Sequence, residues 1–390
     1  MSISVAFFYP KTGTNVHKSY ELLEKSLSKT LSFYYPYAGR LNKDGCSVDC
    51  NDMGVELSHV RVHCPMSQIL KQPYTHAKHV VFPVDQPHGH QKGNLAITQV
   101  SHFDCGGIAI GGCISHKIGD GCTASNFFNN WGVLTRDISA TPSPHFVGKS
   151  IYPQSNNPYV ISTIEFEEPT YLGKRFIFPI DKLNSLKAKI ANESGVQNPS
   201  RTEIVSALLY KCAHVAVAGR RSTNFDSFKP SSLFQVANMR QRLNPPLSQD
   251  ACGNIISGYF VKINNERDIN YPKLVSELRK EKMKINTTKN VIISEVTDSL
   301  EKGNTPFHSN IIDNFFCTSL MSYPFYKIDF GWGRPARVSF ATGPFNRWFY
   351  LLDNQSGGGV EVIVYLDEQA MAIFERDPEL LEFASPISNI

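Results

Sequence analysis

Hydrophobic and polar positions in the first third of the chain follow the spacing of strands and helices. Residues 3–8 form an apolar run that ends before Pro10, which predicts a strand. Over residues 16–31, apolar side chains recur every three or four positions, which predicts an amphipathic helix. Two more strands are expected at residues 95–101 and 108–115, joined by the turn-forming sequence Asp-Cys-Gly-Gly. This part of the chain therefore mixes strands with helices.

Residues 139–170 interrupt this pattern and are rich in Pro, Ser and Asn, which indicates a linker between two domains. After the linker, a strand is expected at residues 174–180, followed by a helix that Asp181 can cap. Ser200 and Glu203 match a capping box, which opens a helix that runs to residue 217. Further strands are expected at 231–238, 255–263, 338–342, 348–352 and 360–366, with helices at 273–284 and 368–374. The second part of the chain is thus also of the α/β class.

A chain of 390 residues is too long for one ordinary hydrophobic core, which favours two domains. We place the first domain at residues 1–156, a crossover linker at 157–172 and the second domain at 173–390. The formal charge is only +4 and the sequence has no block of Lys or Arg, so a nucleic-acid partner is not indicated. A mild positive charge is compatible with an anionic small molecule.

The first residues lack the basic segment and the long apolar run of a signal peptide. No stretch approaches the ~20 apolar residues that a membrane helix needs. We therefore expect a cytoplasmic protein with no membrane partner. Nine cysteines, an odd number, then favour free thiols over a disulfide framework.

His116 is the best candidate for a general base, because it stands where an expected strand gives way to a glycine-containing loop. The alternative is a histidine that takes no part in chemistry. Asp120 lies four residues further on, and on a continuous helix the two side chains would form an Asp–His dyad. Gly119 and Gly121 argue against a helix there. A structural Asp120, which caps the next helix at residues 123–134 or pairs with an arginine, is at least as well supported.

Metal and thiol chemistry have weaker support in the sequence. Cys113, His116 and Cys122, or His88 with His90, could contribute metal ligands, but neither set has a zinc spacing with a second ligand pair. We therefore expect no metal. A nucleophilic thiol at Cys113 or Cys122 would need a lowered pKa, and nothing nearby in the sequence promises one.

Two further segments are unusual in composition. Asp329-Phe330-Gly331-Trp332-Gly333 predicts a tight loop in which the aspartate anchors the backbone. Arg240 and Arg242 follow the expected strand at 231–238 and offer two guanidinium groups. These groups could pair a carboxylate in the core or meet a ligand phosphate. The sequence does not decide between those two roles.

Together these residues resemble the plant BAHD acyl-CoA-dependent acyltransferases. The family carries an HxxxD motif and a DFGWG motif, which correspond here to residues 116–120 and 329–333, in the same order and at the same separation. Segments 35–40, 104–107 and 238–246 also match, so the resemblance covers almost the whole chain. It implies two chloramphenicol-acetyltransferase-like domains, each a mixed sheet with flanking helices, joined by a crossover loop. Acyl-CoA and the acceptor would enter a channel between the domains from opposite faces.

The resemblance also implies a role for each site residue. His116 would deprotonate the acceptor, which then attacks the thioester directly, without an acyl-enzyme. Asp120 would point away from the channel and pair with Arg240, as structural support. Asp329, Gly331, Trp332 and Gly333 would be structural, and channel-lining residues would be Thr318, Ser319 and Leu320, the last at a position where tryptophan is common. Acyl-CoA would be a co-substrate with no permanently bound cofactor, and the protein would be a monomer.

Ser115 stands where many family members carry a second histidine, which resembles the branch of vinorine synthase and the acylsugar acyltransferases. We therefore expect transfer of a short or branched acyl group to a hydroxyl of an acylated sugar such as an acylsucrose. An alkaloid O-acetyltransferase of the vinorine-synthase type is the alternative. The chain begins at the strand of residues 2–8, without the strand and helix that usually precede it in the family. A catalytically weak, truncated member is therefore a further alternative. A hydrolase is another, since a histidine base could activate water instead of an alcohol.

Overall fold

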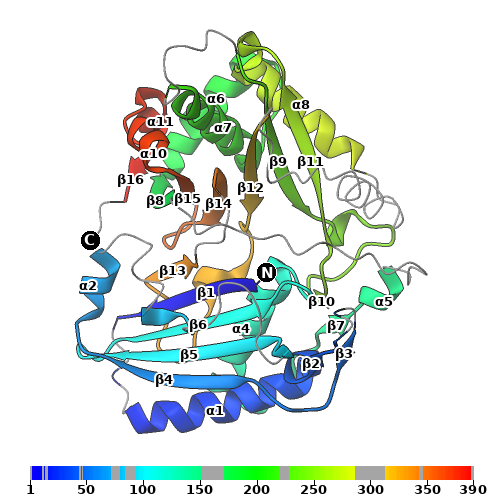
Figure 1. Ribbon diagram of the computed structural model, residues 1–390, viewed down its shortest axis with the longest axis vertical. Coiled ribbons are helices and arrows are strands. Elements are labelled where there is room, and N and C mark those ends of the chain that lie inside the picture. The colour runs from blue at the N-terminus through cyan, green and yellow to red at the C-terminus, as the bar shows by residue number, and fades with distance from the viewer. Residues whose placement is uncertain are drawn as a thin grey trace.

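The described part of the chain folds into two bodies, each built on one β-sheet (Figure 1). The computed structural model describes residues 2–10, 13, 16–43, 45, 47–71, 80–83, 93–151, 171–219, 228–285, 312–341 and 346–387. Strands and helices are mixed in both bodies, so the α/β class predicted from the sequence is confirmed. Most of the expected crossover linker at 157–172, and both His88 and His90, lie outside the described residues.

The sheet of the first body contains five described strands in the order β13-β1-β6-β5-β4. Their bounds are β1 (Ser2–Tyr9), β4 (Glu56–Val62), β5 (Ala96–Phe103), β6 (Ile108–Ser115) and β13 (Arg337–Phe340). The pair β4–β5 is parallel, and the other neighbours are antiparallel. Because β13 pairs with β1, a late segment of the chain returns to complete the first sheet.

Two helices, α1 (Val16–Phe33) and α4 (Gly121–Arg136), share one core with this sheet. Trp131 of α4 is buried and donates a hydrogen bond to the carbonyl of Leu23 in α1 at 3.2 Å. Phe128 packs on Phe7 of β1 with ring centroids 5.3 Å apart. Shorter elements of this half are η1 (Tyr35–Ala38), β2 (Arg40–Leu41), β3 (Val48–Asp49), α2 (Met66–Lys71), β7 (His145–Phe146) and α5 (Gly148–Ile151).

The sheet of the second body contains seven described strands in the order β11-β9-β12-β14-β15-β8-β16. Their bounds are β8 (Tyr171–Phe178), β9 (Ser231–Asn238), β11 (Ile256–Ile263), β12 (Asp313–Ser319), β14 (Trp348–Asp353), β15 (Val360–Asp367) and β16 (Ser385–Pro386). β12 runs parallel to both of its neighbours, and the other pairs are antiparallel.

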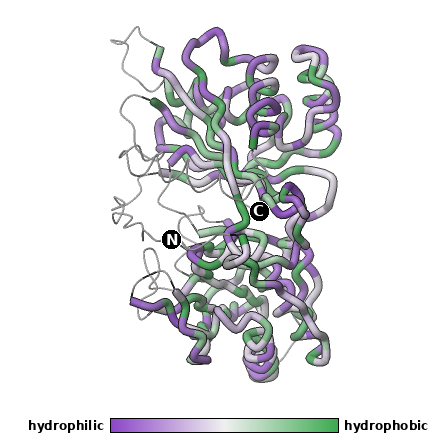
Figure 2. The backbone as a smooth tube through the Cα atoms, turned by 90° about the vertical axis from the view of Figure 1, so that its right-hand side faces the viewer, coloured by the Kyte–Doolittle hydropathy of each residue, from purple (hydrophilic) through white to green (hydrophobic). Residues whose placement is uncertain are grey.

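Helices share the main core of the second body with its sheet, and α7 lies at the centre of that core (Figure 1). The helices are α6 (Ile180–Ser194), α7 (Arg201–Gly219), α8 (Tyr271–Lys284), α10 (Glu368–Phe374) and α11 (Pro378–Phe383). Small linking elements are η3 (Arg240–Arg242), β10 (Ala251–Cys252), η4 (Glu266–Asp268) and η5 (Pro324–Lys327). Seen from the side, the two bodies are stacked along the long axis, and hydrophobic and hydrophilic segments alternate along both (Figure 2).

Most predicted elements are present, with a few corrections. The capping box is confirmed, since the Ser200 amide donates to the Glu203 carboxylate at 2.7 Å. Asp181 does not cap α6, because the helix starts one residue earlier and Pro179 takes the N-cap position. β4, β12 and α11 were not predicted from the hydrophobic pattern. Among the described residues, no helix is both long enough and apolar enough to cross a membrane.

Candidate active site

His116 is carried to the junction of the two bodies by the middle strand of the first sheet. β6 is buried along its whole length, and His116 follows its last residue, Ser115. The chain then turns towards α4 through Gly119, where a Cβ atom would collide with the hydroxyl of the buried Tyr37. The histidine side chain itself is half-buried. A rigid strand and a tightly packed turn thus fix its position.

The side-chain amide of Asn254 fixes the orientation of the His116 ring. Its Nδ2 donates a hydrogen bond to the His116 carbonyl at 2.6 Å, and its Oδ1 lies 2.9 Å from Nδ1 of the ring. Since Oδ1 can only accept, Nδ1 must carry the proton that forms this second bond. In the neutral ring Nε2 is then unprotonated. The hydrogen-bond network therefore selects the tautomer in which Nε2 can accept a proton.

Asp120 is a structural residue rather than the partner of His116 in a dyad. It is the N-cap of α4, where its carboxylate accepts a hydrogen bond from the Thr123 amide at 2.9 Å. The same carboxylate makes a bidentate ion pair with Arg240, with distances of 2.7 and 2.9 Å. Both structural roles expected from the sequence are therefore present together. No continuous helix places Asp120 above His116, because residues 116–120 form a turn.

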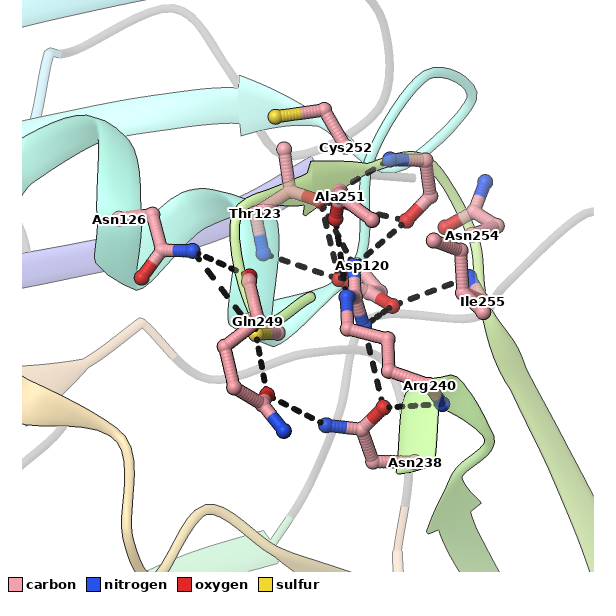
Figure 3. A network of polar contacts seen from close by, with 12 residues as sticks. Asp120, Thr123, Asn126, Asn238, Arg240, Gln249, Ala251, Cys252, Asn254 and Ile255 are labelled. Carbon is pink, nitrogen blue, oxygen red and sulfur yellow. Dashed lines mark hydrogen bonds and ion pairs between the residues drawn. The ribbon is translucent and has the colours of Figure 1, made fainter. Parts of the chain in front are cut away.

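Arg240 joins the two halves of the chain at this turn (Figure 3). The side chains of Arg240 and its ion-pair partner Asp120 are both at most 1% exposed. Beyond Asp120, the guanidinium donates to the Ala251 carbonyl at 2.9 Å and to the Asn238 side chain at 3.2 Å. Burial alone would lower the pKa of Arg240, but its hydrogen bonds and ion pair with Asp120 outweigh burial and raise it. The arginine stays charged in a water-excluded position, which a buried pair needs.

Each of residues 253–255 contacts the turn at residues 116–120, and the sequence analysis did not identify them. The Gly253 carbonyl accepts a hydrogen bond from the Asp120 amide at 3.2 Å, and the Ile255 amide donates to the Asp120 carboxylate at 3.0 Å. Asn254 lies between them and holds His116. The local signal, a Gly-Asn pair before a strand, indicates only a turn. The partner of that turn is set by how the two bodies dock.

The second motif shapes a loop on the first body, where Phe330 is buried and Gly331 and Gly333 are exposed. The Asp329 carboxylate accepts hydrogen bonds from the amides of Gly331 at 2.7 Å and Gly333 at 2.9 Å. Both glycines have positive φ, 99° and 85°, which favours glycine. The backbone anchoring predicted for Asp329 is therefore present. Its carbonyl also accepts a hydrogen bond from Arg136 at the end of α4.

Aromatic side chains fasten this loop to the first body. Phe330 is buried and meets Trp131 edge-on, with ring centroids 5.1 Å apart. Trp332 lies 5.5 Å from the ring of Tyr9, and the Tyr9 hydroxyl donates to the Ile328 carbonyl at 2.9 Å. The loop thus packs against α4 and β1 of the first body. β13 follows the loop in the chain and pairs with β1 in the first sheet.

A cavity of about 390 Å³ opens between the two bodies. Its walls come from α4, the first turn of α7, the end of β9, η3, α8 and the segment after β12. The lining side chains include Cys122, Asn126, Thr202, Glu203, Gln235, Asn238, Arg242, Gln249, Lys282 and Ser319. His116 is not among the lining residues, but Asn238 is, and it accepts hydrogen bonds from Arg240. One lining residue of the cavity, Asn238, therefore contacts the ion pair that supports the turn at residues 116–120.

The three expected channel residues do not share one environment. Ser319 lines the cavity and lies 3.4 Å from the Thr202 hydroxyl. Leu320 is buried, and its side chain packs against Gly121 at the start of α4. Thr318 is half-buried and does not line the cavity, since neighbouring residues of a strand point to opposite faces.

The thiols near the site are buried and weakly acidic. Burial raises the pKa of Cys113 to about 11, and likewise that of Cys122. Neither thiol therefore has the lowered pKa of a nucleophile. Within the described ranges, no group of three or more His, Cys, Asp or Glu side chains could hold a metal ion.

Comparisons with known proteins agree with this geometry. The family model described as "Transferase family" matches residues 1–381. The chain is 44% identical to acyltransferase Pun1 of Capsicum frutescens, over 98% of this chain and 90% of that protein. It is 37% identical to acylsugar acyltransferase 3 of Solanum lycopersicum, over 98% of this chain and 89% of that protein. The crystal structure of vinorine synthase superposes with a TM-score of 0.83 at 27% identity, over 100% of this chain and 92% of that one.

These matches extend over both bodies and include the turn at residues 116–120 and the DFGWG loop. The two-body fold expected from the resemblance is confirmed by the superposition on vinorine synthase. The protein is an acyltransferase, since the family match and the relatives agree on that class. The chain belongs to the BAHD family of acyl-CoA-dependent acyltransferases of plant specialised metabolism.

Proposed function

We propose that the protein transfers an acyl group from a CoA thioester to an acceptor hydroxyl, with His116 as general base. The observation that supports this role best is the Asn254 side chain, whose Oδ1 accepts a hydrogen bond from Nδ1–H of His116, so that Nε2 of the neutral ring is unprotonated. A general base accepts a proton, and an unprotonated Nε2 is the ring atom that can do so. Asp120, held by Arg240, keeps the turn in place and touches no substrate in this scheme.

The reaction then proceeds by direct attack. Nε2 takes the proton of the acceptor hydroxyl as its oxygen bonds to the thioester carbonyl carbon. The tetrahedral intermediate collapses, the carbon–sulfur bond breaks, and the proton passes from the imidazolium to the leaving CoA thiolate. Acyl-CoA is consumed as a co-substrate, and no step requires a metal or a permanently bound cofactor.

For the acceptor we propose an acylated sugar and for the donor a short or branched acyl-CoA. The relative named acylsugar acyltransferase 3, at 37% identity, supports this choice. The likeness to vinorine synthase, at 27% identity, supports an alkaloid hydroxyl as the second candidate. The domain limits at 1–156 and 173–390, a monomeric state and a cytoplasmic location stay predictions.

The test is thiol release from acetyl-CoA and from branched short-chain acyl-CoAs, with acylated sugars and alkaloid alcohols as acceptors. Wild-type protein is compared with His116→Ala, and His145→Ala serves as a matched control because His145 is an exposed histidine in β7. We expect acceptor-dependent release that falls by roughly 10²–10⁴-fold in His116→Ala and stays unchanged in the control.

Two results would contradict the proposal. Release that survives in His116→Ala removes the histidine from the mechanism. Free acid formed by the wild type without any acceptor identifies a hydrolase instead.

A further inference from the structure

Two cysteines lie at one end of the edge strand of the first sheet. β4 is the last strand in the order β13-β1-β6-β5-β4, and among the described strands it pairs only with β5 (Figure 1). Cys64 follows the end of β4 by two residues, and Cys105 follows the end of β5 by two residues. The two strands are parallel, and their last residues, Val62 and Phe103, face each other. Both cysteines therefore emerge at the same end of the sheet.

Contacts beyond the last strand pair keep the two segments together. The Asp104 amide donates a hydrogen bond to the Val62 carbonyl at 3.2 Å, and Nδ1 of His63 lies 4.0 Å from the Asp104 carboxylate. The Met66 amide then donates to Sγ of Cys105 at 3.3 Å, which holds this sulfur against the segment that follows β4. Neighbouring strands lie about 4.7–4.9 Å apart, and a disulfide needs Cα atoms about 4.4–6.8 Å apart. Cysteines side by side at the end of two paired strands meet that requirement.

The two thiols differ in their access to solvent. Cys105 is exposed and Cys64 is half-buried, and both are free thiols in the structure. Burial raises the pKa of Cys64, and the negative charges of Asp104 and Cys105 raise it further. The effect of one sulfur on the other reflects their proximity. An oxidant would therefore reach Cys105 first, and Cys64 would react second, from close by.

We propose that Cys64 and Cys105 form a reversible disulfide, a redox-controlled clamp on the edge strand β4, with glutathione disulfide or a similar small disulfide as the oxidant. The Cys105 thiolate attacks one sulfur of the oxidant and forms a mixed disulfide, and the first glutathione leaves as a thiolate. The Cys64 thiolate then attacks the Cys105 sulfur and displaces the second glutathione. The two protein thiols lose two protons and two electrons in total, and one glutathione disulfide becomes two glutathione molecules.

The bond would stabilise the first body where its sheet is least protected. The outer side of β4 has no strand partner among the described residues, and an edge strand with a single neighbour is where a sheet opens most easily. A cross-link between residues 64 and 105 limits the freedom of the unfolded chain over the loop that it closes. Cys105 precedes β6, whereas His116 follows the other end of that strand, so the bond leaves the proposed base in place.

The experiment equilibrates the folded wild-type protein with mixtures of glutathione and glutathione disulfide. Free thiols are then blocked with an alkylating reagent, and disulfide-linked peptides are identified by mass spectrometry. We expect a peptide that contains Cys64 linked to one that contains Cys105. Trypsin leaves Cys105 and Cys113 together on the peptide of residues 93–117, so fragmentation of that peptide identifies the linked sulfur.

Single variants supply the matched controls. Cys64→Ser and Cys105→Ser should form no bridge and should carry one glutathione on the cysteine that is left of the pair. Cys50→Ser removes another exposed cysteine of the same body and should form the bridge as the wild type does.

The melting temperature tests what the bond does. The wild type supplies both the oxidised and the reduced state, so this comparison does not depend on a variant that folds poorly. We expect the oxidised protein to melt about 5 °C higher than the reduced protein, because a disulfide that closes a long loop destabilises the unfolded state. The shift should disappear after treatment with dithiothreitol and should be absent in Cys64→Ser.

Two results would overturn the proposal. One is a folded wild type in which Cys64 and Cys105 each carry a separate glutathione, since this would show that the two sulfurs do not meet. The other is a bridge that forms without raising the melting temperature, since it would then not clamp the edge strand.

Discussion

Asp120 and Asp329 occupy similar sequence settings but do different work in the structure. Each is followed closely by glycine in one of the two motifs. Asp120 is fully buried and bonds to Arg240 and Ile255 from the other half of the chain. Asp329 is half-buried and bonds mainly to the backbone of its own loop, at Gly331 and Gly333. One carboxylate joins the two bodies beside His116, the proposed general base, whereas the other shapes a single turn.

The difference shows how burial changes the importance of one residue type. A half-buried carboxylate can exchange its hydrogen bonds for water when they are lost. The Asp120 carboxylate cannot, because loss of its guanidinium partner leaves a charge in a water-excluded position. The two motifs should therefore respond very differently to mutation.

The largest effect is expected for Arg240→Met, which leaves the Asp120 carboxylate buried and unpaired. We expect the free energy of unfolding to fall by about 3–5 kcal/mol, measured by urea denaturation. The double variant Asp120→Asn/Arg240→Met removes the stranded charge, so it should be less damaging than the single variant. Equal losses in both variants would show that the ion pair is not what stabilises the turn.

A smaller effect, mainly on catalysis, is expected for Asn254→Leu. Loss of the hydrogen bond to Nδ1 should lower kcat by roughly ten- to a hundredfold, since such bonds are worth about 1–3 kcal/mol and 1.36 kcal/mol is a factor of ten. Asn254→Asp keeps an acceptor for Nδ1 but adds a negative charge that favours the imidazolium. Its pH–rate profile should therefore shift towards higher pH. A structural role for Asn254 alone would lower stability and leave the profile in place.

Asp329→Asn should have a still smaller effect. The amide oxygen can still accept from the Gly331 and Gly333 amides, although without the charge, so a loss of about 1 kcal/mol in the free energy of unfolding is expected. The value of kcat should not change, because the loop contacts Arg136 at the last turn of α4, whereas His116 precedes the first turn of that helix. A large loss of kcat with normal stability would give Asp329 a role that its contacts do not show.

A third carboxylate gives the smallest effect, as a dependence of stability on pH. Burial acts to raise the pKa of Glu203, but hydrogen bonds from Arg279 and Ser200 outweigh it, and the pKa is lowered below its usual 4.5. A lowered carboxyl pKa contributes stability that is complete above 4.5 and is lost as the pH falls through the folded-state value. In Glu203→Gln, the decrease in the free energy of unfolding that this carboxyl causes in acid should be absent. Urea denaturation at several pH values between neutral and acidic measures it. An unchanged acid profile would contradict the assignment.

The sequence predicted the parts of the site that depend on local patterns. His116 follows a run of small and β-branched residues, and Asp120 precedes a helical pattern, so both could be placed from spacing. Asn254 could not, because it meets His116 only after the two bodies dock, 138 residues apart in the chain.

The channel residues show a second limit of prediction. The family resemblance implied that Thr318, Ser319 and Leu320 line one channel, and β12 was not predicted. Once β12 is known, the alternation of a strand separates Thr318 from Ser319. In the same way, the return of β13 to the first sheet follows from the docking of Phe330 and Trp332 on the first body. No local pattern encodes that path.

The protonation state of the His116 ring tests the proposed role of the site most directly. Nitrogen-15 NMR of histidine-labelled protein, recorded well above the usual histidine pKa, distinguishes a protonated ring nitrogen from a bare one. Comparison with His116→Gln assigns the signals of this residue among the twelve histidines. We predict that Nδ1 carries the proton and Nε2 is bare, as the hydrogen bond to Asn254 requires. A proton on Nε2 with Nδ1 bare would contradict the proposal that Asn254 orients a general base.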